Sequence, residues 1–264
     1  MKESGQVIIH EEEDFQNMRN AGKLAASVLD YITGYVRPGV TTNELDTLCH
    51  NKIIESGAVP APLNYRGFPK SICTSINHVV CHGIPGDKKL NKEDIVNIDV
   101  TVILNGWHGD TSRTYFVDKK TPIKAKRLVE VTYEAMMRGI EVIKPDIPLY
   151  EIGRVIQEYI EKFGYSAVRE YCGHGIGREF HTSPSVLHYY HKDNDLILQK
   201  GMFFTVEPMI NAGMWQTRLL NDGWTVVTKD NSLSAQFEHT IGVTDDGYEI
   251  FTKSPKGYNC PPYV

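Results

Sequence analysis

The chain has 264 residues, of which 41% are hydrophobic and 23% are charged, a composition typical of one large or two small globular domains. The formal net charge of −5 argues against a nucleic-acid-binding protein, and no apolar run approaches the roughly 20 residues that a membrane span needs. Five cysteines without a CxxC pair disfavour a thiolate zinc site and a disulfide framework and favour a reducing compartment. Because the N-terminal sequence MKESGQVIIHEEED is also unlike a signal peptide, we expect a soluble, cytoplasmic protein that binds neither membranes nor nucleic acids.

The predicted elements follow the same order in both halves of the chain. A long helix over residues 12–35 leads to a turn with a proline and a second helix, and a long helix over residues 124–143 leads to the same two features. Strands come next in each half, and this segregation of helices from antiparallel hairpins predicts an α+β fold. The predicted strand regions are residues 70–82, 95–117, 166–171, 202–210 and 223–248.

An internal repeat relates the two halves. VRPGVTTNELDTLCHNKIIESG, residues 36–57, aligns without gaps on IKPDIPLYEIGRVIQEYIEKFG, residues 143–164, at an offset of 107 residues. Amphipathic helices can resemble one another by chance, but here the proline before the helix and the glycine after it also coincide. We therefore expect one catalytic domain over residues 1–264, built from repeats of approximately 12–120 and 121–250, with a cleft between two sheet-bearing lobes.

Two aspartates lie in the predicted hairpin IVNIDVTVILNGWHGDTSRTY, which starts at residue 95. Its Asn-Gly pair is a strong signal for a two-residue turn, and that turn places Asp99 opposite Ser112 and Asp110 opposite Thr101. The two acids are then diagonal neighbours on one face of the sheet. A carboxylate in a half-buried strand is costly unless its charge is offset, so the alternatives are a shared proton, exposure near the turn or a bridging cation.

The second half supplies three further polar groups in apolar surroundings. Glu207 lies in the strand-like GMFFTVEPMI, Glu238 in SAQFEHTIGVT, and His174 in YCGHGIGREFH, where the flanking glycines allow a tight loop. Four carboxylates and one imidazole suit two divalent ions such as Mn²⁺, Fe²⁺, Co²⁺ or Zn²⁺, with Ni²⁺ as a further option, because the charges then nearly cancel. These residues predict a dinuclear metal site.

Six motifs resemble, in order, those of the type I methionine aminopeptidase family. They are HGIP from residue 82, NIDVT from 97, GDTSRT from 109, GHGIGREFH from 173, EPM from 207 and EHT from 238, and the resemblance covers about residues 9–251. It implies the pita-bread fold, whose two symmetric halves agree with the repeat. Only 25 residues separate His181 from Glu207, which leaves no room for the type II insertion and indicates a bacterial or organellar form.

The resemblance also implies a role for each site residue. The metal ligands would be Asp99, Asp110, His174, Glu207 and Glu238, with Asp110 and Glu238 bridging both ions. The catalytic residues would be His82 near the substrate amine, His181 near the scissile peptide oxygen, and Glu207 as the proton shuttle.

An apolar methionine pocket is expected beside these groups. It would draw on Tyr65, Phe68, Cys73, Phe180 and Trp224, next to His82 and His181. The sequence departs from the family pattern at the pocket rim, where RGFP over residues 66–69 replaces His-Gly-Tyr-Pro and Pro62 replaces a cysteine. We interpret His10, His50, His188 and His191 as structural histidines, because they lie outside the motifs.

The implied activity is removal of the N-terminal methionine from peptides and nascent chains when the second residue is small. A hydroxide bridging the two ions would attack the first peptide bond. We expect a monomer. The basic run KKTPIKAKR, residues 119–127, is best explained as a solvated helix start, and contact with the ribosome is the less favoured alternative. The rival hypotheses are an Xaa-Pro dipeptidase or aminopeptidase P of the same fold, and a pita-bread binding module without catalysis.

Overall fold

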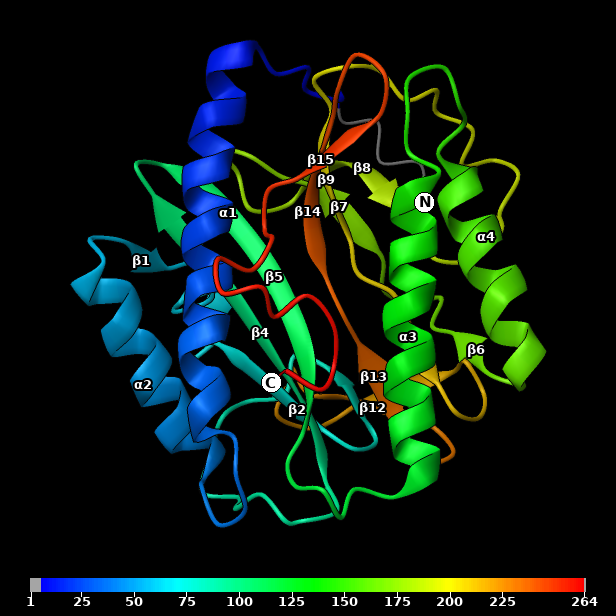
Figure 1. Cartoon of the computed structure of the whole chain (residues 1–264). Coiled ribbons are helices and arrows are strands. Elements are labelled where there is room, and N and C mark those ends of the chain that lie inside the picture. The colour runs from blue at the N-terminus through cyan, green and yellow to red at the C-terminus, as the bar shows by residue number, and fades with distance from the viewer. Residues whose placement is uncertain (1–5, 264) are drawn as a thin grey trace.

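Two pairs of α-helices flank the sheets of this protein in the computed structural model, which describes residues 6–263 (Figure 1). Residues 1–5 of the acidic N-terminal stretch and Val264 lie outside the described part of the chain. Each pair combines a long helix with a shorter one, in the predicted order. The helices are α1 (Glu12–Ile32), α2 (Thr42–Glu55), α3 (Ile123–Glu141) and α4 (Tyr150–Ile160). Within residues 6–263, none of the helices has the length and apolarity to cross a bilayer.

The predicted hairpin forms the centre of the first half. Strands β4 (Ile95–Leu104) and β5 (Trp107–Phe116) pair antiparallel, and both turn residues between them have positive φ angles, 52° and 80°, as this type of two-residue turn requires. Asp99 pairs with Ser112 and Asp110 with Thr101, which confirms the predicted register. On the other side of β4 lie the short strands β1 (Val59–Pro60) and β2 (Cys73–Ile76).

Within residues 6–263, three further sheets complete the fold. The largest has the order β15-β14-β9-β7-β8, and one of the two smaller sheets pairs β3 of the first half with β12 of the second. The halves are therefore joined through a common sheet. The strands are β3 (Val79–Cys81), β6 (Ser166–Ala167), β7 (Gly173–Gly175), β8 (Thr182–Val186), β9 (Phe203–Val206), β10 (Met209–Asn211), β11 (Thr217–Leu219), β12 (Val226–Thr228), β13 (Ser234–Gln236), β14 (His239–Val243) and β15 (Tyr248–Ile250).

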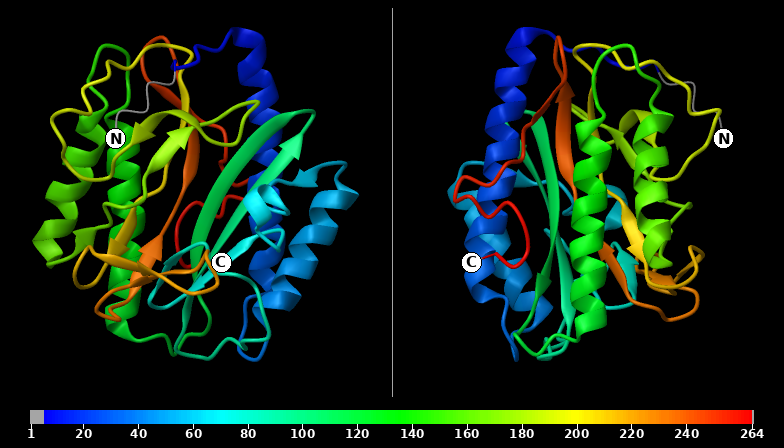
Figure 2. Two further views of the ribbon diagram at one scale, coloured as in Figure 1. Left: turned by 180° about the vertical axis from the view of Figure 1, so that it is seen from behind. Right: turned by 45° about the vertical axis from the view of Figure 1, so that its right-hand side comes forward.

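The apolar face of β4 explains why its acid points toward the second half. Ile98, Val100 and Val102 are fully buried in a core that also contains Leu29 of α1 and Leu45 of α2. Because side chains alternate along a strand, Asp99 must lie on the opposite face. Figure 2 shows the strands of both halves lying between the two helix pairs, so that this opposite face is directed toward the second half.

The two halves meet along β5. The backbone N–H of Glu238 donates to the Ser112 carbonyl at 3.2 Å, and the Thr111 hydroxyl donates to the Glu238 carbonyl at 2.7 Å. Two residues after Glu238, the Thr240 hydroxyl donates to the Asp110 carbonyl at 2.7 Å. These bonds hold the start of β14 beside β5, and they bring an acid of each half to the same junction.

The C-terminal segment, residues 251–263, covers the back of this junction. It runs between α1 and α3 in front of β5 (Figure 1). The buried carboxylate of Asp30 on α1 accepts from Arg113 of β5 at 2.8 Å, from the Ser254 hydroxyl at 2.7 Å and from the Lys256 backbone N–H at 3.1 Å. One buried ion pair therefore links the first helix, the central hairpin and the tail.

Candidate active site

All twelve predicted site residues line one cavity of about 790 Å³ between the two halves. Asp99 and Asp110 enter it from β4 and β5, while His174 enters it from β7 of the second half. Pocket residues of both halves surround these polar groups. The predicted residues that line the cavity are Tyr65, Phe68, Cys73, His82, Asp99, Asp110, His174, Phe180, His181, Glu207, Trp224 and Glu238.

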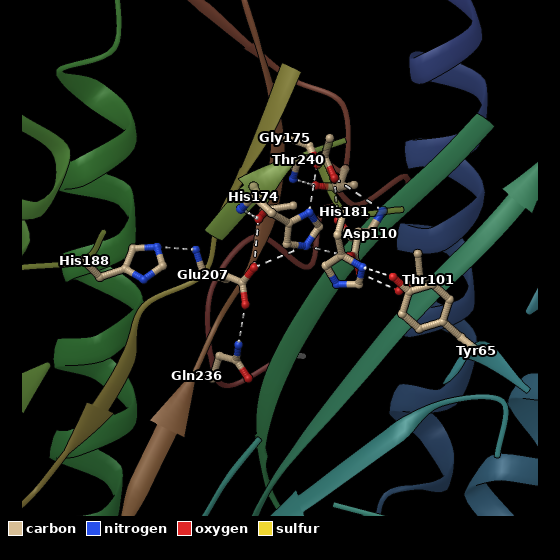
Figure 3. A network of polar contacts seen from close by, with 12 residues as sticks. Tyr65, Thr101, Asp110, His174, Gly175, His181, His188, Glu207, Gln236 and Thr240 are labelled. Carbon is tan, nitrogen blue, oxygen red and sulfur yellow. Dashed lines mark hydrogen bonds and ion pairs between the residues drawn. The ribbon is translucent and has the colours of Figure 1, made fainter. Parts of the chain in front are cut away.

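Three of these side chains converge most closely. One ligand atom each of Asp110, His174 and Glu238 lies within 4.8 Å of the others, a spacing at which they could hold one metal ion. His174 Nε2 lies 3.6 Å from Asp110 Oδ2 and 3.5 Å from Glu207 Oε1 (Figure 3). Both distances are longer than a good hydrogen bond. The imidazole therefore faces two carboxylates without donating to either.

His174 has the protonation state and orientation of a metal ligand. Burial lowers the pKa of its imidazole to about 4, so the ring is neutral at pH 7. Its Nδ1 lies 3.1 Å from the Gly175 carbonyl, which can only accept, so Nδ1 carries the proton. The Nε2 lone pair then points into the acid cluster, as in a histidine that binds a metal and is oriented by a backbone carbonyl.

The four acids are held in surroundings that disfavour their charge. Burial raises the pKa of Asp99 to about 7 and that of Glu207 to about 8. Burial and the neighbouring acids raise the pKa values of Asp110 and Glu238 well above the ordinary range. Among the described residues, no lysine or arginine pairs with any of these acids.

This donor set fits divalent cations. Asp99 Oδ1 is buried without a hydrogen-bond partner, which is costly for a carboxylate oxygen unless a cation binds there. Oxygen ligands with one neutral imidazole suit first-row divalent ions rather than a thiolate zinc centre. The cluster therefore has the composition and the unsatisfied atoms of a metal site.

The local placement of three residues differs from the prediction. Glu207 and Glu238 were expected inside strands, but Glu207 follows β9 directly and Glu238 precedes β14, so both lie where regular pairing ends. His174 was expected in a loop, but it is the middle residue of β7. The reasons are long-range contacts: Glu238 is bonded to Ser112 and Thr111 of β5, and the Glu207 N–H is bonded to His188 rather than to a neighbouring strand.

The glycines beside His174 also act differently from the expectation. Neither has a positive φ angle, so they do not provide an unusual backbone conformation. Instead, a Cβ on Gly173 would collide with the Thr205 carbonyl oxygen, and one on Gly175 would collide with the Ser183 carbonyl oxygen. Since β7 lies between β8 and β9, the missing side chains allow both neighbouring strands to approach closely.

Several residues that the sequence reasoning did not identify support the acids. The Thr101 hydroxyl donates to Asp110 Oδ1 at 2.7 Å, the Thr205 hydroxyl donates to Glu207 Oε1 at 2.8 Å, and Gln236 Nε2 donates to Glu207 Oε2 at 3.2 Å (Figure 3). Thr205 stands two residues before Glu207. Period-two alternation along a strand is a sequence signal that could have found it.

His188 combines a structural position with a contact to the site. It is only 1% exposed, as expected for a structural histidine, but its Nε2 accepts the backbone N–H of Glu207 at 3.0 Å. This N–H would otherwise lack a partner because β9 ends at Val206 and Pro208 interrupts the pairing. His188 therefore holds the backbone at the point where Glu207 turns into the cavity.

Aromatic rings form the wall beside the acids. The Tyr65 hydroxyl lies 3.0 Å from His181 Nδ1, and the Tyr65 and Phe180 rings lie 4.9 Å apart. A second pair of rings in the lining, Phe68 and Trp224, meets edge to face at 5.1 Å. Further apolar and aromatic lining that the sequence reasoning did not include comes from Cys81, Tyr171, Cys172 and Met209.

His82 stands on a strained backbone at the edge of this wall. Its φ angle is 55°, in the left-handed region that residues with a Cβ rarely adopt. Its ring meets those of Tyr171 and Trp224 edge to face at 5.6 and 6.3 Å. Burial lowers the pKa of His82 and lowers that of His181 to about 3, so both rings are neutral at pH 7. Strain of this kind is typical of positions where the chain must present a functional side chain.

The chain is similar to known metallopeptidases over nearly its whole length. The sequence profile of metallopeptidase family M24 matches residues 16–245. A protein of Rickettsia prowazekii named methionine aminopeptidase is 66% identical over 258 residues, which cover 97% of this chain and 99% of that protein. The methionine aminopeptidase of Escherichia coli K12 is 56% identical over 248 residues, which cover 93% and 94% of the two chains.

Solved structures agree with this relationship. The crystal structure of the Rickettsia prowazekii methionine aminopeptidase superposes with a TM-score of 0.92 at 65% identity, covering 94% of this chain and 100% of that one. An Xaa-Pro dipeptidase of Bacillus anthracis superposes with a TM-score of 0.75 at 25% identity, covering 94% of this chain and 62% of that one. The predicted pita-bread fold is therefore confirmed, and the chain belongs to metallopeptidase family M24.

Proposed function

We propose that this protein is a methionine aminopeptidase, which removes the N-terminal methionine from peptides and nascent chains whose second residue is small. The convergence of Asp110, His174 and Glu238 carries the proposal, because a neutral imidazole and two crowded carboxylates need a cation to be stable together. The family and its near full-length relatives narrow the chemistry to peptide hydrolysis at a chain end.

Two divalent ions would be held by the four acids and the imidazole. The residues that would hold them are Asp99, Asp110, His174, Glu207 and Glu238, all of which line the cavity. The buried, unpartnered Asp99 Oδ1 supports the inclusion of this residue, although it lies outside the closest group of three. When bound, such ions supply Lewis acidity, which activates a water molecule and polarises a peptide carbonyl.

The other residues would bind and orient the substrate. The methionine side chain would pack against the apolar wall formed by Phe68, Cys73 and Trp224, since an unbranched thioether packs well against aromatic rings. His181, which the Tyr65 hydroxyl orients, would donate from Nε2 to the peptide oxygen as negative charge develops there.

Glu207 is the group that we assign to proton transfer. Thr205 and Gln236 donate to its two oxygens, and His188 holds its backbone, so the carboxylate has a defined position. Burial raises its pKa in the absence of metal, and a bound cation would favour the carboxylate, which is the form that can accept a proton. It would take a proton from the attacking water and pass it to the leaving amine.

The proposed function also implies what the protein acts on and where in the cell it acts. We propose a monomer that acts in the cytoplasm on nascent chains. Contact with the ribosome through residues 119–127 stays a hypothesis. An Xaa-Pro dipeptidase is less well supported, because the Bacillus anthracis structure is 25% identical to this chain, whereas the Rickettsia prowazekii methionine aminopeptidase structure is 65% identical.

The decisive experiment measures release of methionine from Met-Ala-Ser by protein stripped of metal, with ions added back one at a time. We expect no activity without metal, recovery with at least one of Mn²⁺, Fe²⁺, Co²⁺, Zn²⁺ or Ni²⁺, and no turnover of Xaa-Pro dipeptides. His174→Ala should abolish the recovered activity. His50→Ala is the matched control, since His50 bonds Ser71 outside the cavity. Full activity in His174→Ala would refute the assignment of the site.

A further inference from the structure

One cationic side chain lies at the mouth of the substrate cavity and has no assigned role. Among the described residues that line the cavity, Arg66 is the only lysine or arginine. Its side chain is exposed, and no carboxylate of the described residues forms an ion pair with it. An unpaired positive charge beside a substrate path is available to bind an anionic group of the substrate.

The backbone around Arg66 is held in an unusual conformation. Arg66 has a φ angle of 48°, and Asn64 and Gly67 on either side of the turn have φ angles of 66° and 88°. The Asn64 N–H donates to the Phe68 carbonyl at 2.8 Å and the Phe68 N–H donates to the Tyr65 carbonyl at 2.9 Å, which closes the turn. A left-handed arginine is costly and persists only where its surroundings enforce it, so the position of Arg66 is determined by the turn.

A chain of contacts links Arg66 to His181 through Tyr65. Its guanidinium carbon lies 5.3 Å from the centre of the Tyr65 ring, and the hydroxyl of that ring lies 3.0 Å from His181 Nδ1. The Tyr65 ring therefore lies between Arg66 and His181, and our proposed function places His181 at the scissile oxygen. An extended peptide advances about 3.3–3.6 Å per residue, so its third and fourth residues would pass this ring.

We propose that Arg66 binds a carboxylate on the part of the substrate that follows the scissile bond, and so gives the enzyme a preference for an acidic third or fourth residue. This inference rests on the proposed function. The other charged group at the mouth is Glu170, whose Oε1 accepts from the Thr217 backbone N–H at 3.2 Å. A peptide that leaves along the Tyr65 wall meets Arg66 rather than Glu170, and an acidic residue there gains the attraction.

The test compares Met-Ala-Asp-Ser, Met-Ala-Ser-Ser and Met-Ala-Lys-Ser, each with an amidated C-terminus, in the metal-loaded enzyme. At low salt we expect kcat/KM to be about three- to tenfold higher for the Asp peptide than for the Lys peptide, as for charge pairs at partly solvated sites. Arg66→Lys should keep this order, Arg66→Gln should remove it, and Arg66→Glu should reverse it. About 0.5 M NaCl should weaken the preference, because exposed charges are screened.

Arg127→Glu is the matched control, since Arg127 is also exposed and lies 5.1 Å over the Phe163 ring but does not line the cavity. It should leave the ratio unchanged. Comparing the free-acid tripeptide Met-Ala-Ser with its amide separates a C-terminal carboxylate from an acidic side chain as the bound group. Equal Asp to Lys ratios in the wild type, Arg66→Gln and Arg66→Glu would overturn the proposal. Loss of Met-Ala-Ser cleavage in every metal-loaded form would instead overturn the proposed function.

Discussion

Replacing Asp99 with asparagine should stabilise the metal-free protein at neutral pH and above, although it should weaken metal binding. Asp99 Oδ1 is buried without a hydrogen-bond partner, and burial raises the pKa of this carboxyl to about 7. The same carboxyl has a pKa of about 4 in an unfolded chain. Because the folded state holds the proton more tightly, the stability that Asp99 contributes is fully present below pH 4 and is lost as the pH rises through 7.

The size of the effect follows from this shift. Between pH 5 and pH 7 the unfolded carboxyl is ionised and the folded one is not, and at about 1.4 kcal/mol per pH unit this difference costs roughly 3 kcal/mol. For a chain of this size it corresponds to about 5–10 °C in Tm. Buried histidines act in the opposite direction, because burial lowers the pKa of His174 to about 4 and that of His188 to about 3. The informative quantity is therefore the difference between the wild type and Asp99→Asn.

The assay is chemical denaturation of both proteins after metal removal, from pH 5 to pH 8. The stability advantage of Asp99→Asn should grow by roughly 3 kcal/mol over this range, and saturating Mn²⁺ should restore the advantage of the wild type. Asp94→Asn is the control, because Asp94 accepts from Asn77 Nδ2 and from the Asn91 N–H, both at 2.8 Å, and should only lose stability. Parallel curves for the wild type and Asp99→Asn would refute the reasoning.

Three further substitutions test the supports of the site. Gly175→Ala should lower the free energy of unfolding by about 2 kcal/mol or more in thermal denaturation, because its Cβ would meet a carbonyl oxygen of the neighbouring strand, and an unchanged Tm would contradict this. Thr101→Val removes the hydrogen bond to Asp110 and should weaken metal affinity about tenfold in a competitive titration, with little change in fold; equal affinity would argue against this role. His188→Ala should leave the Glu207 N–H without an acceptor and lower the free energy of unfolding by about 1–3 kcal/mol. It should also lower kcat more than it raises KM. A loss confined to stability would show that His188 does not position Glu207.

The part of the site that lies on one hairpin could be predicted from the sequence. Alternation of apolar residues assigns Asp99 to the face away from the core, and the Asn-Gly turn sets the register that places Asp110 beside it. Both signals act over a few residues, so a local pattern is sufficient to determine them. The identities of His174, Glu207 and Glu238 as cavity residues could also be inferred, since polar groups in apolar surroundings need a partner.

The tertiary structure alone decided how those residues are held. The sequence pattern placed Glu207 and Glu238 within strands, whereas contacts with β5 and with His188 place them at strand ends. It also attributed the glycines around His174 to backbone freedom, although their role is close approach between strands. These features depend on residues far apart in the chain, for which a local pattern carries no information. The alternation of apolar residues therefore determined which side chains point away from the core. Packing between the two halves determined where those side chains meet.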